Sequence, residues 1–412
     1  MGAEGKKATS FRTNPNANVP SEMALQDTEA DRAFRQEVRD WLAENLVGEF
    51  AELGSRGGPG REHEGFEERQ AWERKLGAAG LTCLGWPRAH GGREATLGQQ
   101  VAFHEEYARA GAPARLGHIG EGLIGPTIIE FGTAAQKERF LPPIRSGDEL
   151  WCQGYSEPDA GSDLANVKTR AERDGDEWVI TGQKVWTSLA TWADWVFVLC
   201  RTDASAPKHK GLSYLLVPMD QPGIEVRPIV QLTGTSEFNE VFFDGARTPA
   251  GNIVGDVNDG WRVAMGTLAF ERGVATLGQQ VGFERELTNV IVSAQKNGAN
   301  QDPVMRQRLA ESWIGLRLLR YNALRSLASI ADGTPGPEAS ISKLHWASWH
   351  RALGELAVDV QGVHGLLADG APYDLTDEQR LFLFTRADTI YGGSNQIQRN
   401  IIGERALGLP RS

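Results

Sequence analysis

Two short segments carry residue types that suit a flat, conjugated ring with a phosphate tail. The first, at 154–163, reads GYSEPDAGSD, and the second, at 182–188, reads GQKVWTS. Glycine lets a backbone approach a ligand closely, serine supplies hydroxyl and amide donors, and the indole of Trp186 offers a stacking face. We interpret both segments as turns around such a ligand. A ligand-free pair of Gly- and Ser-rich hairpins has the same pattern, and the pattern alone does not decide between them.

Other common catalytic patterns are missing from the sequence. There is no G-x-G-x-x-G after a strand and no G-x-x-x-x-G-K-[ST], which argues against a nicotinamide or P-loop nucleotide site. The eight histidines show no metal-binding spacing, and His345 and His350 stand five residues apart, off one helical face. We therefore predict no metal site and interpret the histidines as structural or surface residues. Ser205 and Lys208 form an S-x-x-K pattern, but a turn in a hydrophilic connector is the expected structure there.

Four regions of different composition position these segments. Residues 1–26 are polar without an apolar period and predict a flexible leader, whereas 27–148 carry apolar residues at helical spacing. Residues 149–254 alternate short β-branched and aromatic runs with turn residues, and 255–412 return to long helical periods. The expected fold class is α+β and multidomain, with an N-terminal all-α domain, a middle β-sheet or barrel domain and a C-terminal antiparallel four-helix bundle.

The individual elements can be predicted from the same periods. Expected helices are Glu29–Leu46, Phe66–Ala79, Gln99–Ala110, Trp261–Gln295, Val304–Ala331 and Ala339–Val360. Expected strands are Glu177–Thr181, Trp195–Leu199, Leu212–Pro218, Gly223–Pro228 and Asn239–Phe243.

Composition limits the partners and the environment. The 412 residues are 40% hydrophobic and 24% charged, typical of a globular protein, and the net charge of −11 disfavours nucleic acid. No run of about 18 apolar residues is present, so we predict no membrane insertion and a cytoplasmic location. Three scattered cysteines, Cys83, Cys152 and Cys200, predict buried free thiols rather than disulfides.

The two segments together resemble a known family. The pattern E-P-x-A-G-S-D followed by G-x-K-x-W-x-[ST] is similar to the flavin-binding sheet domain of acyl-CoA dehydrogenases. Residues 132–142 (GTAAQKERFLP) resemble the end of that family's N-terminal domain, and 397–402 (IQRNII) resemble its last helix. The resemblance extends over residues 28–410.

The resemblance implies a cofactor, a reaction and partners. FAD is expected between the sheet domain and the C-terminal helices, with a fatty or modified acyl-CoA against the flavin. A carboxylate removes the proton alpha to the thioester and the beta hydrogen leaves as hydride to the flavin, which gives a trans-2-enoyl-CoA. An electron-transfer flavoprotein is the implied acceptor. Carried over by position, the flavin-binding residues are Tyr155, Ser156, Gly161, Ser162, Trp186, Ser188 and Ser394, with Ser188 standing where many relatives have Thr.

The position of the catalytic base departs from the commonest family pattern. Many members carry a Glu directly after the tyrosine that corresponds to Tyr391, but this chain has Gly392 there. In isovaleryl-CoA and long-chain dehydrogenases the base lies on an earlier helix within L-x-x-E-R, and 268–272 reads LAFER. The resemblance therefore implies Glu271 as the base, with Arg272, Ser162 and Gly392 at the substrate. An ordinary ion pair of Glu271 with Arg272 is the alternative, although consecutive helical residues point apart.

Further departures bear on substrate and assembly. The glycine at 392 removes side-chain volume, which suggests a bulky, branched, aromatic or steroid-derived acyl group and a role in lipid or steroid degradation. Gln295 and Val363 replace an arginine and a glycine that reach a neighbouring subunit's FAD in homotetrameric relatives. Besides a homotetramer or homodimer, a heterotetramer with a homologous subunit is therefore predicted. A non-catalytic half-site subunit and a flavin oxidase or monooxygenase remain alternatives.

Overall fold

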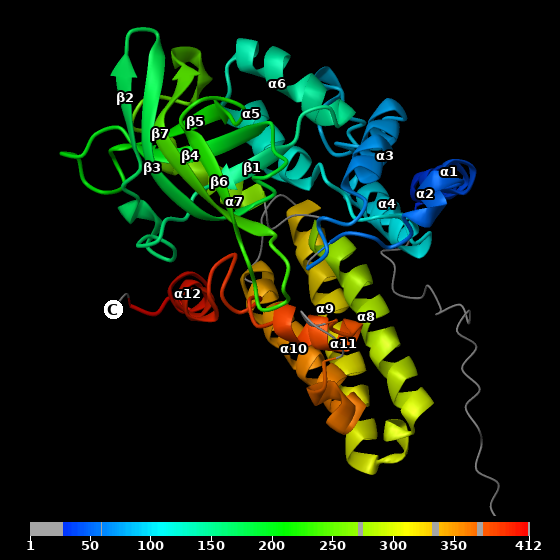
Figure 1. The fold of residues 1–412 in the computed structure, drawn as a ribbon. Helices are drawn as coiled ribbons and strands as arrows, with labels where there is room; N and C mark the ends of the chain where they lie inside the picture. Colours follow the sequence, from blue (N-terminus) through cyan, green and yellow to red (C-terminus); the bar gives the residue numbers. More distant parts are fainter. Residues whose placement is uncertain (1–27, 59, 271–274, 332–337, 369–373, 411–412) are drawn as a thin grey trace, which may run out of the picture.

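The computed structural model describes residues 28–58, 60–270, 275–331, 338–368 and 374–410. Within these ranges helices come first, a β-sheet follows and long helices end the chain, so the predicted fold class is confirmed (Figure 1). In Figure 1 the sheet and the N-terminal helices lie side by side above the long C-terminal helices.

The N-terminal region is a small helical domain. Its helices are α1 (Glu29–Asn45), α2 (Glu49–Glu52), α3 (Phe66–Ala78), α4 (Leu97–Arg109), α5 (Gly125–Phe131) and α6 (Ala134–Ser146). Capping boxes at Thr28, Thr96 and Thr133 begin α1, α4 and α6, because each threonine hydroxyl accepts from the third backbone N–H of its helix. The sequence prediction located α1, α3 and α4 to within two residues and missed the shorter α5 and the proline-containing α6.

The middle region is an eight-stranded sheet of order β6-β7-β3-β2-β4-β5-β8, with β1 pairing in parallel with β4. The strands are β1 (Trp151–Gly154), β2 (Arg170–Asp174), β3 (Glu177–Ser188), β4 (Trp195–Arg201), β5 (Leu212–Pro218), β6 (Ile224–Ile229), β7 (Phe238–Pro249) and β8 (Ile253–Val254).

Strands β3 and β7 show that the interpretation of 182–188 as a turn is wrong. The segment 182–188 is not a turn, because β3 continues as far as Ser188, where it still pairs with Phe238 of β7. The pairing becomes irregular between Lys184 and Thr187. A β-bulge of this kind keeps a strand going while re-aiming individual side chains. The turn-forming residue types therefore mark an irregular strand.

The C-terminal region is helical: α7 (Gly260–Phe270), α8 (Ala275–Asn297), α9 (Pro303–Ala331), α10 (Glu338–Gln361), α11 (Asp377–Phe384) and α12 (Asn395–Ile401). Helix α10 contacts α8, α9 and α11, and the three long helices run beside one another in Figure 1. Throughout the part of the chain that the structure describes, each helix is too short or too polar to cross a membrane.

The cysteines behave as the sequence predicted. Cys83, Cys152 and Cys200 are free and buried. Burial raises the pKa of the Cys200 thiol to about 12, so this group is a neutral core residue at ordinary pH.

Close packing of α9 against α10 depends on one glycine. A Cβ placed on Gly315 would lie 2.5 Å from the Trp349 indole, which is well inside van der Waals contact. The same indole is buried and donates to the carbonyl oxygen of Ser312 at 2.8 Å, so it has little room to move. Gly282 on α8, by contrast, faces open space.

We predict opposite effects of the same substitution at these two glycines. Gly315→Ala should lower the free energy of unfolding by about 1–3 kcal/mol, because overpacking outweighs the gain in helix propensity. Gly282→Ala should leave stability unchanged or raise it by about 0.5–1 kcal/mol. Chemical unfolding followed by far-UV circular dichroism measures both, and equal effects at the two positions would contradict the packing argument.

Candidate active site

A buried lysine organises the middle-domain part of the site. Lys184 on β3 is fully buried, and its Nζ donates to Glu157 Oε1 at 2.8 Å, the Leu199 carbonyl at 2.8 Å and the Tyr155 carbonyl at 3.1 Å. An ammonium group has three donors, so all of them are satisfied. The segment that follows β1 is therefore tied to both β3 and β4.

Glu157 completes this arrangement with backbone bonds. Its two carboxylate oxygens accept from the backbone N–H of Lys168 at 2.6 Å and of Thr169 at 2.9 Å. Burial alone would raise the pKa of Glu157, but the Lys184 ammonium and these donors together hold it below its usual value. Burial lowers the pKa of Lys184, and the charge of Glu157 opposes this shift. The pair ties the 155–169 segment to β3.

Next to the pair, the Trp186 side chain faces outward. Its exposed fraction is 58%, while its neighbours Val185 and Thr187 are buried. The backbone of Trp186 has φ +62°, an uncommon conformation for a bulky residue that coincides with the irregular β3–β7 pairing. Val185 N–H donates to the Ser156 carbonyl at 2.9 Å. The structure therefore places Ser156, next to Tyr155, beside Val185, the residue before Trp186.

The other predicted cofactor residues fall on three separate segments, two in the middle region and one in the C-terminal region. Gly161 and Ser162 are exposed just after a short bridge between Glu157 and Ala160, and a Cβ at Gly161 would meet no other atom within 4 Å. Ser188 ends β3 and is half-buried.

The C-terminal contribution lies on the turn before α12. Ser394 caps α12, its hydroxyl accepting from Ile397 N–H at 3.4 Å, and Gly392 is exposed with φ +60°. Helix α12 packs on α10 of the bundle.

Beneath Tyr155 lies a cluster of buried hydroxyl groups that the sequence did not reveal. The Tyr155 ring meets the Tyr214 ring edge-on, with centroids 6.2 Å apart. The Tyr214 hydroxyl is 3.2 Å from Thr267 Oγ1, which in turn is 2.9 Å from Thr127 Oγ1. Tyr214, Thr267 and Thr127 are completely buried and come from β5, α7 and α5. All three regions of the chain are therefore joined here, and α7 is anchored below the predicted flavin residues.

The predicted base and its neighbour, Glu271 and Arg272, lie outside the described residues. The description of α7 ends at Phe270, whose side chain is 37% exposed. The roles of Glu271 and Arg272 stay predictions.

The described residues fit a bound flavin. An indole that is more than half exposed, on a strand whose adjacent side chains are buried, offers a face to a flat ring. Hydroxyl groups of Ser156, Ser162 and Ser188 are accessible on the neighbouring backbone, and open space surrounds Gly161. Hydroxyl and amide donors of this kind suit the polar edge of an isoalloxazine and a phosphate.

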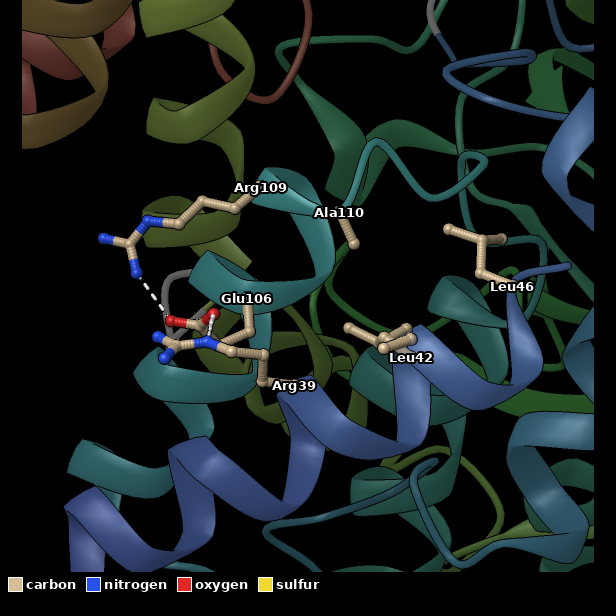
Figure 2. Close-up of a pocket in the computed structure, with 7 residues that line it drawn as sticks. Arg39, Leu42, Leu46, Glu106, Arg109 and Ala110 are labelled. Atoms are coloured by element: carbon tan, nitrogen blue, oxygen red, sulfur yellow. Dashed lines mark hydrogen bonds and ion pairs between the residues drawn. The ribbon is translucent and has the colours of Figure 1, made fainter. Parts of the chain in front are cut away.

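A surface hollow elsewhere has a different character. It lies between α1 and α4, has a volume of about 460 Å³ and is lined by Arg39, Leu42, Ala43, Leu46, Glu106, Arg109 and Ala110 (Figure 2). Both guanidinium groups point at the same carboxylate, with Arg39 Nε 3.0 Å and Arg109 Nη1 2.6 Å from Glu106. None of the predicted site residues lines this hollow.

Comparison with protein families matches three consecutive domains. The N-terminal, middle and C-terminal domain models of acyl-CoA dehydrogenases match residues 28–148, 152–246 and 258–407.

Individual relatives extend the comparison. The acyl-CoA dehydrogenase IpdE1 of Mycobacterium tuberculosis is 62% identical over 387 residues, covering 94% of this chain and 99% of the relative. IpdE1 of Mycolicibacterium smegmatis is 62% identical over 388 residues, covering 92% and 97%. Among solved structures, the Tcur3481-Tcur3483 steroid ACAD has a TM-score of 0.80 at 31% identity, covering 95% of this chain and 100% of that one. The ChsE4-ChsE5 complex of M. tuberculosis has a TM-score of 0.77 at 30% identity, with the same coverage.

We predict that the buried lysine is a major source of stability. Lys184→Met should lower the free energy of unfolding by about 3–5 kcal/mol, because it leaves the Glu157 carboxylate buried without its counter-ion. Lys168→Met is the matched control. The Lys168 side chain is 69% exposed, and among the described residues its ammonium pairs with an exposed Asp159, so its loss should cost less than about 1 kcal/mol. Similar losses in the two variants, measured by denaturant titration, would disprove the role assigned to Lys184.

Proposed function

Because the chain belongs to the acyl-CoA dehydrogenase family and is thus an oxidoreductase of a flavoprotein family, we propose that it uses FAD to convert an acyl-CoA thioester to its trans-2-enoyl-CoA. The observation that carries the cofactor assignment is the exposed Trp186 held beside Ser156 by the buried Lys184–Glu157 pair. Bound FAD supplies a hydride acceptor for the beta hydrogen of the substrate.

The residues of the chain have separate tasks in this proposal. Trp186 would offer its indole face to the ring of bound FAD, and Tyr155, Ser156, Gly161, Ser162, Ser188 and Ser394 would hold the cofactor. Glu271 takes the proton from the carbon alpha to the thioester. A carboxylate enclosed by an acyl chain and a flavin loses hydration, which raises its pKa and makes it a stronger base. Arg272 and Ser162 contact the substrate.

The anchoring of α7 supports Glu271 as the base. Thr267 and Leu268 pack into the core that also contains Tyr155, and Glu271 follows Thr267 by four residues in the sequence. At position 392, where many relatives carry the base, the exposed glycine has no acidic group to offer.

The substrate class and the assembly are finer parts of the proposal. Gly392 leaves space for a bulky acyl group, and two similar solved structures with TM-scores of 0.80 and 0.77 are a steroid ACAD and the ChsE4-ChsE5 complex. Gln295 is exposed, and Val363 is 73% exposed, so neither is engaged in the core of this chain. We infer a bulky, ring-bearing or branched acyl-CoA and a homologous partner subunit, with an electron-transfer flavoprotein as acceptor.

Replacement of the base tests the mechanism. Glu271→Gln should slow anaerobic flavin reduction by acyl-CoA by about 10²- to 10⁴-fold, since an amide cannot accept the proton. The flavin spectrum and FAD content should stay unchanged. Glu284→Gln on α8 is the control, because that carboxylate is half-exposed and, within the described ranges, pairs with Arg317 at 3.6 Å. Undiminished flavin reduction in Glu271→Gln would exclude it as the base.

A panel of acyl-CoAs tests the cofactor, the reaction and the substrate class together. The purified protein should be yellow, and branched or steroid-side-chain acyl-CoAs should bleach it anaerobically faster than butyryl-CoA. Turnover of only short straight chains would contradict the bulky-acyl assignment. Full FAD content and turnover by the chain alone would remove the need for a partner. Peroxide formation that outpaces reduction of an artificial acceptor would instead indicate an oxidase.

A further inference from the structure

A row of hydrogen-bonded polar groups, of which His350 and Asp388 are buried, crosses the bundle and ends at the turn before α12. His350 on α10 is 5% exposed and lies between two carboxylates. Its Nδ1 is 2.7 Å from Asp388 Oδ2, and its Nε2 is 2.7 Å from Glu286 Oε2 on α8. The imidazole therefore links α8 and α10 to the segment that follows α11.

Asp388 connects His350 to the turn through Tyr391. It is completely buried, and its second oxygen, Oδ1, accepts from the Tyr391 hydroxyl at 2.7 Å. Its backbone carbonyl accepts from Lys343 Nζ. The same ammonium lies over the rings of Trp346 and Tyr391, 4.2 and 4.9 Å from their centroids. Tyr391 is thus held at its hydroxyl and at its ring, directly before Gly392.

The turn itself has little freedom. Gly392 and Gly393 have φ of +60° and +89°, a region that favours glycine. A Cβ at Gly393 would lie 2.5 Å from Gln398 Nε2, and that amide donates to the Gly392 carbonyl at 3.4 Å. A displacement of Asp388 would therefore move Gly392 and Ser394 with it.

We propose that His350 is a positioning residue, which through Asp388 and Tyr391 fixes the turn that carries Gly392 and Ser394 and so locates that edge of the flavin and acyl site. The part of this inference that concerns flavin and substrate rests on the proposed function. The mechanical link between His350 and the turn does not.

The charges around His350 determine how the link depends on pH. Burial lowers its pKa, but the hydrogen bonds and charges of Asp388 and Glu286 outweigh burial and raise the pKa to about 9. Two further polar groups, the Lys343 ammonium and the Tyr391 hydroxyl, bond to Asp388. The pKa of His350 is higher in the folded protein than in the unfolded chain. The stability that protonated His350 contributes is therefore complete below the ordinary pKa of about 6.5 and is lost as pH rises through about 9.

Hydrogen exchange of the full chain without flavin tests the link directly. His350→Gln should accelerate amide exchange of residues 388–401 about tenfold or more, since it removes a charge-assisted bond to Asp388. Exchange in β3 should not change. His345→Gln is the matched control: it lies on the same helix, and no hydrogen bond of its side chain is found among the described residues. In the unmodified chain the protection of 388–401, corrected for intrinsic exchange, should fall as pH rises through about 9.

Tyr391→Phe supplies an independent measurement in case His350→Gln does not fold. It removes one hydroxyl group and should also accelerate exchange of the turn. In the double variant the effects should be less than additive, because both act through Asp388. Additive effects in the double variant would overturn the inference. So would exchange of the turn in His350→Gln and Tyr391→Phe that is no faster than in His345→Gln.

The flavin-loaded protein then tests the part that concerns the site. His350→Gln should weaken FAD retention or raise the KM for acyl-CoA at pH 7, whereas His345→Gln should change neither. If His350→Gln accelerates amide exchange of the turn but leaves FAD retention and the KM for acyl-CoA unchanged, the turn does not position the site. If the wild-type chain binds no flavin, the proposed function is refuted. The exchange result would still show whether His350 holds the turn.

Discussion

The site depends on one buried cation. The Lys184 ammonium sits where water cannot reach it, so each of its three donors must find an oxygen inside the protein, and Glu157, Tyr155 and Leu199 supply them. This requirement draws the 155–169 segment onto β3 and beside β4. With Lys184 turned inward and the β3–β7 pairing irregular beyond it, Trp186 is left facing outward next to Ser156. A rigid polar interior thus produces an exposed aromatic face.

At one place the three regions of the chain meet through hydroxyl groups. Thr127, Tyr214 and Thr267 are each completely buried and bond to one another in the largest apolar cluster, next to the Tyr155 ring. Hydroxyl groups can donate and accept, so a small cluster of them satisfies itself without counter-ions. Their directional bonds fix how α7 lies against α5 and β5, which simple apolar packing would leave adjustable.

The C-terminal side of the site is held by different means. An imidazolium between two carboxylates, Glu286 and Asp388, connects the long helices to the turn at 391–394. The middle-domain side is part of a sheet and is stiffened by its strands, whereas this turn has no sheet to support it. A network of charge-assisted bonds provides the orientation that backbone pairing provides elsewhere.

The sequence by itself determined the order of helical, β and helical regions, the bounds of several elements and the residue types of the two motifs. These features are local: apolar periods, capping residues and turn residues act over a few positions. It did not predict that 182–188 continues a strand, since that depends on pairing with β7, which begins at Phe238, fifty residues after Ser188. Nor did it distinguish His350 from the other histidines, because its partners are 38 and 64 residues away. Only the packing of whole helices brings those groups within 2.7 Å, and no local pattern encodes it.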